Sequence, residues 1–220
     1  MRIIFVRHGN TFAPGEKATW VGLRQDLPLV KEGRAQAKRV ATGLSQVAYS
    51  PDVMCCSSLK RTKEFAEIIK KECRLTVSVV KDKRLNELDY GWWGGLTSEQ
   101  IAARGSVVDL QQWNDRGVWP LSAGFSSSPS EIVSELRFFL NEIYERYGSK
   151  AEVLAVTSNG RLKFLLQFDT NALKIALDRE SVKVKTGHAV VAQYDGRHLT
   201  IEAWNVPPQE LSGVLDGGDS

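Results

Sequence analysis

The sequence is poor in cysteine and histidine, with only three of each among its 220 residues. Cys55 and Cys56 are adjacent and Cys73 stands alone, a spacing that fits neither a disulfide framework nor a metal site. All three lie in apolar surroundings, so we expect reduced cysteines in the core. The N-terminus shows no signal-peptide pattern, and the expected location is therefore the cytoplasm.

Long apolar runs and basic clusters are also missing. No stretch is long and apolar enough to cross a bilayer, so we expect no membrane association. The net charge is only +3, and no segment concentrates Lys and Arg among aromatic residues, which argues against nucleic-acid binding. What remains is a mildly basic globular protein. A small anionic substrate would suit this charge, but many proteins with no anionic ligand carry the same charge.

Short apolar runs alternate with segments of helical periodicity. The predicted strands cover Ile3–Val6, Val53–Ser57, Thr76–Val80, Glu152–Thr157, Ala189–Tyr194 and Leu199–Trp204. The predicted helices cover Lys31–Val47, Leu59–Lys71, Ser98–Ala103, Val107–Asn114, a helix with its start in Ser127-Ser128-Pro129-Ser130 with Glu131, and Leu162–Gln167. This alternation predicts an α/β fold, a three-layer sandwich with a mostly parallel central sheet and helices on both faces.

The domain organisation is expected to be simple. Residues 1–206 are long enough for one domain with a large core. Residues 207–220 are rich in Pro, Gly and Asp and predict a flexible C-terminal tail. Two irregular segments, Phe12–Pro28 and Trp92–Ser128, match no motif, and we expect them to hold the substrate specificity.

Polar residues follow three of the predicted strands at the point where each strand ends. They are Arg7-His8, Ser57 with Arg61, and Thr157-Ser158. Ligands of parallel sheets bind outside the carboxyl ends of the strands, so these residues are expected to meet at one edge.

His8 has the widest range of possible chemistry among these residues. A neutral imidazole can act as a nucleophile, a general base or a metal ligand, although a lone histidine is more often structural. No second histidine lies at ligand spacing from His8, so we expect no metal. Arg7 beside it and the loop Gly9-Asn10, whose amides can cradle an anion, favour the nucleophile.

Several segments together resemble the histidine phosphatase superfamily, the phosphoglycerate-mutase-like family. Arg7-His8-Gly9-Asn10-Thr11 after an apolar strand is similar to the family signature, and Leu29, Glu32-Gly33 and Gln36-Ala37 match its first helix. Ser57-Ser58-Leu59-Lys60-Arg61-Thr62 resembles its second element, and Leu85–Gly91 with Gly94-Gly95-Leu96-Thr97 resembles its third. The matches come in family order from residue 1 to about 205.

The resemblance implies a mechanism without a cofactor. The histidine at the position of His8 accepts a phosphoryl group, and water then hydrolyses the phosphohistidine. The residues matching Arg7 and Arg61 hold the phosphoryl oxygens, for which guanidinium groups are better suited than ammonium groups. The carboxylate matching Glu87 protonates the leaving group. The structural alternatives are a solvated helix-face charge for Arg61 and a surface ion pair for Glu87.

Ser158 departs from the family pattern, because the family has a second histidine there that donates to the transferred phosphoryl group. Serine supplies a neutral donor, and losing one such donor costs roughly 10²–10³ in rate. As an alternative, Ser158 caps the following helix. The amides of Asn159 and Gly160 at the helix start, or His188 from the later strand, could take over the missing role.

The predicted function is hydrolysis of an unidentified small phosphorylated metabolite. Two alternatives stay open: a weak or inactive phosphate-binding member of the family, because of Ser158, and a phosphoglycerate-type mutase. The sequence leaves the oligomeric state open.

Overall fold

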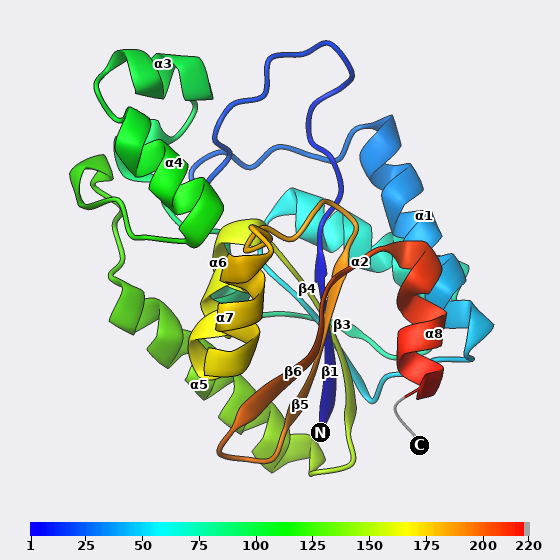
Figure 1. Ribbon diagram of the computed structural model, residues 1–220. Coiled ribbons are helices and arrows are strands. Elements are labelled where there is room, and N and C mark those ends of the chain that lie inside the picture. Colours follow the sequence, from blue (N-terminus) through cyan, green and yellow to red (C-terminus); the bar gives the residue numbers. More distant parts are fainter. Residues whose placement is uncertain (218–220) are drawn as a thin grey trace.

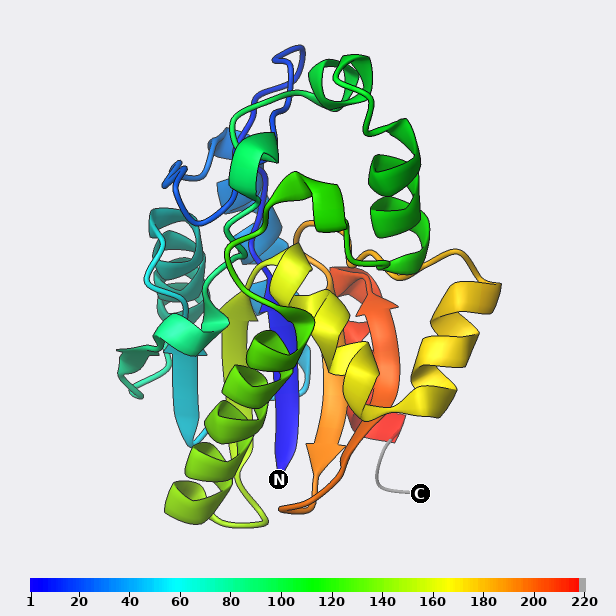
Figure 2. The ribbon, with the colours of Figure 1, turned by 90° about the vertical axis from the view of Figure 1, so that its left-hand side faces the viewer.

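The computed structural model describes residues 1–217 of the chain, with a six-stranded sheet at the centre (Figures 1 and 2). In spatial order the strands are β3, β2, β4, β1, β5 and β6. The first four in this order run parallel, β5 is antiparallel to β1, and β6 is antiparallel to β5. Their bounds are β1 Arg2–Arg7, β2 Val53–Cys56, β3 Val79–Lys81, β4 Glu152–Thr157, β5 Ala189–Tyr194 and β6 Leu199–Val206.

Helices cover both faces of the sheet, so the predicted α/β sandwich is confirmed (Figure 1). On one face lie α1 Lys31–Gln46, α2 Lys60–Glu72 and α8 Leu211–Asp216. On the other face lie α5 Pro129–Tyr147, α6 Asn159–Lys163 and α7 Thr170–Asp178. Part of the chain is in short 3₁₀ turns: Lys83–Leu85, Gly91–Trp93, Leu121–Ala123, Phe164–Phe168 and Pro208–Glu210.

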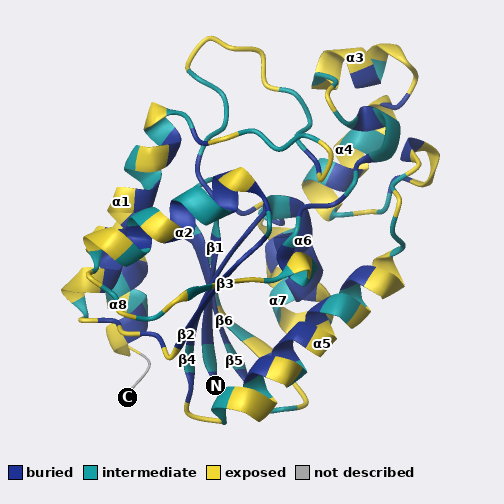
Figure 3. Ribbon diagram, turned by 180° about the vertical axis from the view of Figure 1, so that it is seen from behind, coloured by how far each residue is buried: buried dark blue, intermediate teal, exposed yellow. Residues whose placement is uncertain are grey.

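The central strands are apolar on both faces because both faces are covered. Ile3 and Phe5 of β1 belong to the core beneath α5, while Ile4 and Val6 belong to the core beneath α1 and α2. All four are completely buried. Figure 3 shows the same division, with dark strands inside and exposed residues on the outer sides of the helices. A continuous apolar run is the expected pattern for such a strand.

The predicted start of α5 is confirmed. Ser128 accepts a hydrogen bond from the Glu131 amide, and the Glu131 carboxylate accepts one from the Ser128 amide. This reciprocal pair is the capping box, which satisfies backbone donors at a helix start.

A small cap made of α3 Ser98–Ala103 and α4 Val107–Arg116 lies above the carboxyl ends of the strands (Figure 2). Both helices were predicted, and α4 runs two residues further than expected. Aromatic rings fasten the cap: Trp113 contacts Tyr90, and Trp93 contacts Trp20, at centroid distances of 6.5 and 5.0 Å. Trp93 and Trp113 are almost completely buried, so this irregular segment has a core of its own.

The structure differs from the sequence-based prediction in three other places. Helix α7 was not predicted; the Asp169 carboxylate caps it by accepting from the amides of Asn171 and Ala172. The helix predicted over 162–167 begins earlier, as α6, and continues as a 3₁₀ turn. The third strand covers Val79–Lys81 instead of 76–80.

The C-terminal segment is the clearest correction. The prediction of a flexible tail is wrong for residues 208–216, which form a 3₁₀ turn and α8. Leu211 and Leu215 are buried against α1, and this apolar contact outweighs the local Pro and Gly content. Residues 218–220 of the predicted tail lie outside the described part of the chain. Among residues 1–217, no helix has the length and apolarity needed to span a membrane.

We expect Leu211→Ala to destabilise the protein by about 2–5 kcal/mol, because it leaves a cavity between α8 and α1. Glu210→Ala, at an exposed neighbouring position, is the control. Denaturant unfolding monitored by circular dichroism measures both. A loss below about 0.5 kcal/mol for Leu211→Ala would show that α8 is not part of the cooperative core.

Candidate functional site

His8 lies just after β1 and is held in one orientation. Its amide donates to the Thr157 carbonyl of the neighbouring strand at 3.0 Å, and its side chain is buried. The Nδ1 atom lies 2.7 Å from the Gly9 carbonyl, which can only accept. Nδ1 therefore carries the proton, and the neutral ring has its lone pair on Nε2.

Arg61, on the first turn of α2, faces that lone pair. Its Nε donates to His8 Nε2 at 3.1 Å. The same guanidinium donates to the carbonyls of Gln25 and Gly22, at 2.9 and 3.3 Å. Arg61 is completely buried, so the alternative of a solvated helix-face charge is wrong. These contacts fix a cation beside the nitrogen that can act as a nucleophile.

Two further polar groups at this edge are buried without a hydrogen-bond partner among the described residues. One is Nε of Arg7, whose Nη1 donates to the Val184 carbonyl at 2.6 Å. The other is Oγ of Ser158, which follows β4 and makes no capping bond to α6. The helix-cap alternative for Ser158 is therefore wrong. Unsatisfied buried polar atoms are costly, and in a native protein they often mark a place where a ligand is bound.

Glu87 completes the cluster and is also buried, which excludes a surface ion pair. Its carboxylate accepts from the Leu88 amide at 2.9 Å and from the Gly160 amide at 3.3 Å. Burial, followed by the Glu87 charge, raises the pKa of the nearby Tyr90 well above its ordinary value. A Cβ added at Gly160 would lie only 2.6 Å from the Tyr90 oxygen and would clash with Glu87. Position 160 therefore requires glycine, because the side chains of Glu87 and Tyr90 occupy the space of a Cβ atom.

The electrostatics favour a neutral His8. Burial and then the charges of Arg61 and Arg7 hold the His8 pKa well below its ordinary value of 6.5. Burial also lowers the pKa of both guanidinium groups, and the Glu87 charge opposes this. Arginine remains protonated in proteins, so the cluster combines two cations, one carboxyl group and an uncharged imidazole. Such a group can bind a dianion and present a nucleophile to it.

The side chains of the remaining predicted site residues are hydrogen-bonded to other groups. The Asn10 side chain turns toward α1 and accepts from Gln36 and Thr186. The Asn159 side chain accepts from the Val184 amide. His188 is bonded through Nδ1 to the Asn205 carbonyl, and its side chain lines a pocket whose lining does not include His8.

The sequence-based prediction missed the residues that support the cluster. Tyr90 lies within the Leu85–Gly91 segment, but nothing in the sequence distinguished its role from packing. Lys163 of α6 is buried over the Trp113 ring and donates to the Trp113 carbonyl. Burial, followed by the Lys183 charge, lowers its pKa to about 7. A single lysine in a helical pattern carries no signal for such a position.

The family is shown by comparison with known proteins. The family model of the histidine phosphatase superfamily (branch 1) matches residues 3–207. This chain belongs to that superfamily.

Curated relatives include both mutases and a phosphatase. A 2,3-bisphosphoglycerate-dependent phosphoglycerate mutase of Methylobacterium radiotolerans is 26% identical over 165 residues, which are 74% of this chain and 76% of the relative. Phosphoserine phosphatase 1 of Hydrogenobacter thermophilus is 29% identical over 161 residues, which are 70% of this chain and 69% of the relative.

Solved structures agree on the fold. A mycobacterial glucosyl-3-phosphoglycerate phosphatase has a TM-score of 0.74 at 22% identity, covering 93% of this chain and 98% of its own. Phosphoglycerate mutase from Bacillus anthracis has a TM-score of 0.72 at 19% identity, and the match covers 99% of this chain and 96% of the mutase chain. This superfamily member thus shares the architecture of both enzyme types.

Gly160→Ala should reduce activity toward a phosphomonoester at least about 10-fold, because the new methyl group displaces Glu87. Helix propensity alone predicts the opposite, a gain of about 1 kcal/mol in stability. Gly213→Ala is a matched control, since it lies in α8 with open space around it. Steady-state rates and thermal unfolding should be compared. Equal rates for the two variants would contradict the close-approach argument.

Stability should depend on pH through His8. Its pKa is lowered in the folded state, so below pH 6.5 the unfolded chain binds more protons and stability falls with acidification. Between pH 7.5 and 5.5 the wild type should lose about 1.4 kcal/mol more than His8→Asn. Urea unfolding at both pH values tests this, and parallel losses for the two proteins would show that His8 is not desolvated.

Proposed function

We propose that this protein hydrolyses small phosphate monoesters through a phosphohistidine at Nε2 of His8. The observation that carries the proposal is the fixed tautomer of His8, with Nδ1–H bonded to Gly9 and the Nε2 lone pair facing Arg61. Nε2 is the unprotonated nitrogen, so it can attack phosphorus in line once a phosphoryl oxygen replaces it as the acceptor of the Arg61 Nε–H group.

The residues divide the reaction into two balanced steps. In the first, Glu87 is in its protonated form: Nε2 bonds to phosphorus, the bond from phosphorus to the alcohol oxygen breaks, and the Glu87 carboxyl group gives its proton to that oxygen and becomes a carboxylate. In the second, Glu87 takes a proton from water, the water oxygen bonds to phosphorus, and the phosphorus–nitrogen bond breaks. Arg7 and Arg61 stabilise the charge on the phosphoryl oxygens in both steps.

The hydrogen bonds from the two arginines to backbone carbonyls support the electrostatic part of this mechanism. Arg61 donates to Gln25 and Gly22, and Arg7 donates to Val184, so neither guanidinium group has to be organised when the substrate binds. Preorganised charge is worth more in a buried site than in water. The free Nε of Arg7 and the hydroxyl of Ser158 are the donors left for the phosphoryl oxygens.

A mutase is the second candidate, and the named activity of the Methylobacterium relative favours it. A mutase must keep its phosphohistidine from water until a second substrate accepts the phosphoryl group. Interconversion of 2- and 3-phosphoglycerate with 2,3-bisphosphoglycerate present distinguishes it from a phosphatase, which would release inorganic phosphate. A binding protein without turnover would do neither.

The first test is turnover of p-nitrophenyl phosphate by the wild type, His8→Ala and His198→Ala. We expect His8→Ala to lose at least about 10³-fold in kcat, and we expect His198→Ala, at an exposed turn, to retain the wild-type rate. Rapid quenching should trap an acid-labile phosphoryl group in the wild type and not in His8→Ala. Unchanged turnover in His8→Ala would overturn the proposal, and no turnover in any of the three would favour the binding protein.

Ser158 should act as a weak, neutral donor in the place of the second histidine. We expect Ser158→Ala to lower kcat about 10-fold or more without changing the fold. Ser158→His should raise kcat, although the position is completely buried and the larger ring costs about 1–3 kcal/mol of stability. Rates and unfolding temperatures should be measured together. Unchanged rates for both folded variants would show that position 158 donates nothing to the phosphoryl group.

A further inference from the structure

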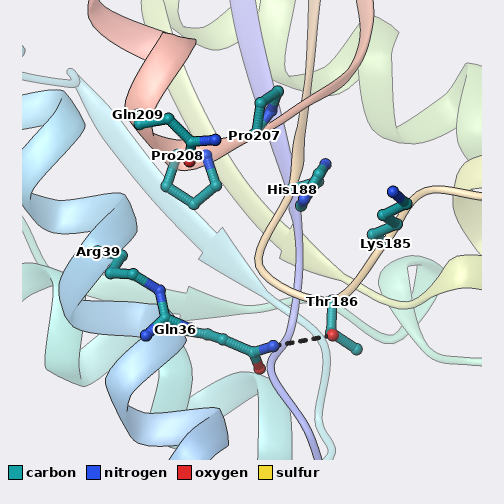
Figure 4. A pocket seen from close by; sticks show the side chains of 8 residues that line it. All are labelled: Gln36, Arg39, Lys185, Thr186, His188, Pro207, Pro208 and Gln209. Carbon is teal, nitrogen blue, oxygen red and sulfur yellow. Dashed lines mark hydrogen bonds between the residues drawn. The ribbon is translucent and has the colours of Figure 1, made fainter.

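A second pocket lies on the α1 side of the sheet, at the start of β5. Its volume is about 400 Å³, within the range of small-ligand sites. Figure 4 shows side chains from three separate segments around it. They are Gln36 and Arg39 from α1, Lys185, Thr186 and His188 from the loop before β5, and Pro207, Pro208 and Gln209 after β6.

The lining is basic and has no acidic member. Arg39 and Lys185 contribute two cations, and the other lining side chains are His188 and uncharged residues. The nearest carboxylate partner is Glu32, which pairs with Arg39 at the rim. Among residues 1–217, no carboxylate lies within salt-bridge distance of Lys185. The pocket therefore favours a ligand that carries negative charge.

His188 adds a second requirement. Its Nδ1 lies 2.9 Å from the Asn205 carbonyl, so Nδ1 carries a proton. In the neutral ring, Nε2 is then an acceptor to which a ligand hydroxyl group can donate. Gln36 and Thr186 offer further polar partners on the opposite wall (Figure 4). A ligand with both an anionic group and hydroxyl groups would satisfy this set.

The pocket wall is connected directly to the His8 loop. The Asn10 amide donates to Gln36, and the Asn10 side chain accepts from both Gln36 and Thr186, at distances of 2.7 to 3.2 Å. On the other side, the Arg7 amide donates to the His188 carbonyl at 3.0 Å. A ligand that competes for the Gln36 or Thr186 side chains would alter the bonds that hold Asn10, two residues after His8.

We propose that this second pocket binds a hydroxylated phosphate monoester of sugar-phosphate size as an effector, separate from the substrate at His8. The phosphate lies between Arg39 and Lys185, and a hydroxyl group donates to His188. Occupation changes the hydrogen bonds of Gln36 and Thr186 to Asn10, and through them the rate at His8.

The binding test uses NMR signals of the histidine side chains, because the chain has only three histidines. In His8→Asn the imidazole NMR spectrum contains only His188, which lines the pocket, and His198, which lies at the exposed turn between β5 and β6 and serves as the control. Glucose 6-phosphate should shift the His188 signals saturably, with a Kd below about 1 mM, and should leave His198 unchanged. Glucose should produce no shift. Inorganic phosphate should bind at least about 10-fold more weakly, because it lacks the sugar hydroxyl groups.

Matched variants test the charge argument. The double variant Arg39→Gln/Lys185→Gln should bind glucose 6-phosphate at least about 10-fold more weakly than the parent protein. The control double variant Lys71→Gln/Lys174→Gln has the same net charge and changes two exposed positions, and its affinity should be unchanged. No saturable His188 shift, or equal weakening in both double variants, would overturn the site. Equal affinity for inorganic phosphate would overturn the hydroxyl requirement.

The effector role is tested separately with His8 present. Glucose 6-phosphate should change turnover of p-nitrophenyl phosphate in the wild type at concentrations that saturate His188, and not in Arg39→Gln/Lys185→Gln. Binding of glucose 6-phosphate without a change in turnover would confirm the binding site and would overturn its proposed role as an effector site. An inactive wild type would refute the proposed phosphatase, whereas the NMR result does not depend on turnover.

Discussion

Two guanidinium groups are buried beside one imidazole, with Glu87 as the carboxylate that faces them, and much of this fold serves to hold that charge in place. Burying an arginine is costly unless its donors are satisfied. The structure meets most of this cost with backbone carbonyls, those of Gln25 and Gly22 for Arg61 and of Val184 for Arg7. The loops that supply these carbonyls are irregular because their carbonyl groups point inward to the arginines instead of joining a sheet.

Close approach between backbone segments is the second condition for the site. A Cβ at Gly9 would lie 2.6 Å from the Gly33 Cα, so the His8 loop rests directly on the first turn of α1. Gly160, which has no Cβ, likewise allows Glu87 to pack directly against the backbone of α6. Because α1 also carries Gln36 and Arg39, one helix supports the His8 loop on one side and lines the second pocket on another. Strain or ligand binding at one place is therefore transmitted through few bonds to the other.

Much of the sheet and most of the helices could be predicted from periodicity, since strands buried on both faces are uniformly apolar and α5 begins with a capping box. The failures have a common cause. Helix α8 follows Pro207-Pro208 and contains Gly213, and α7 follows a short turn, so both depend on packing more than on local preference. The polar site residues were predicted where they end a strand or match a family element. Tyr90 and Lys163 were missed because their roles arise from burial next to partners far away in the sequence.

The sequence by itself determined the alternation of strands and helices, the placing of Arg7, His8 and Ser158 at strand ends, and the membership in a family that uses such residues. These features depend on local periodicity and on short motifs, which are properties of neighbouring residues. Only the tertiary structure decided which nitrogen of His8 carries the proton, which donors stay unpaired, and on which side of the sheet His188 lies. Those outcomes depend on which backbone groups from distant segments come within hydrogen-bonding distance, and no spacing along the chain encodes that.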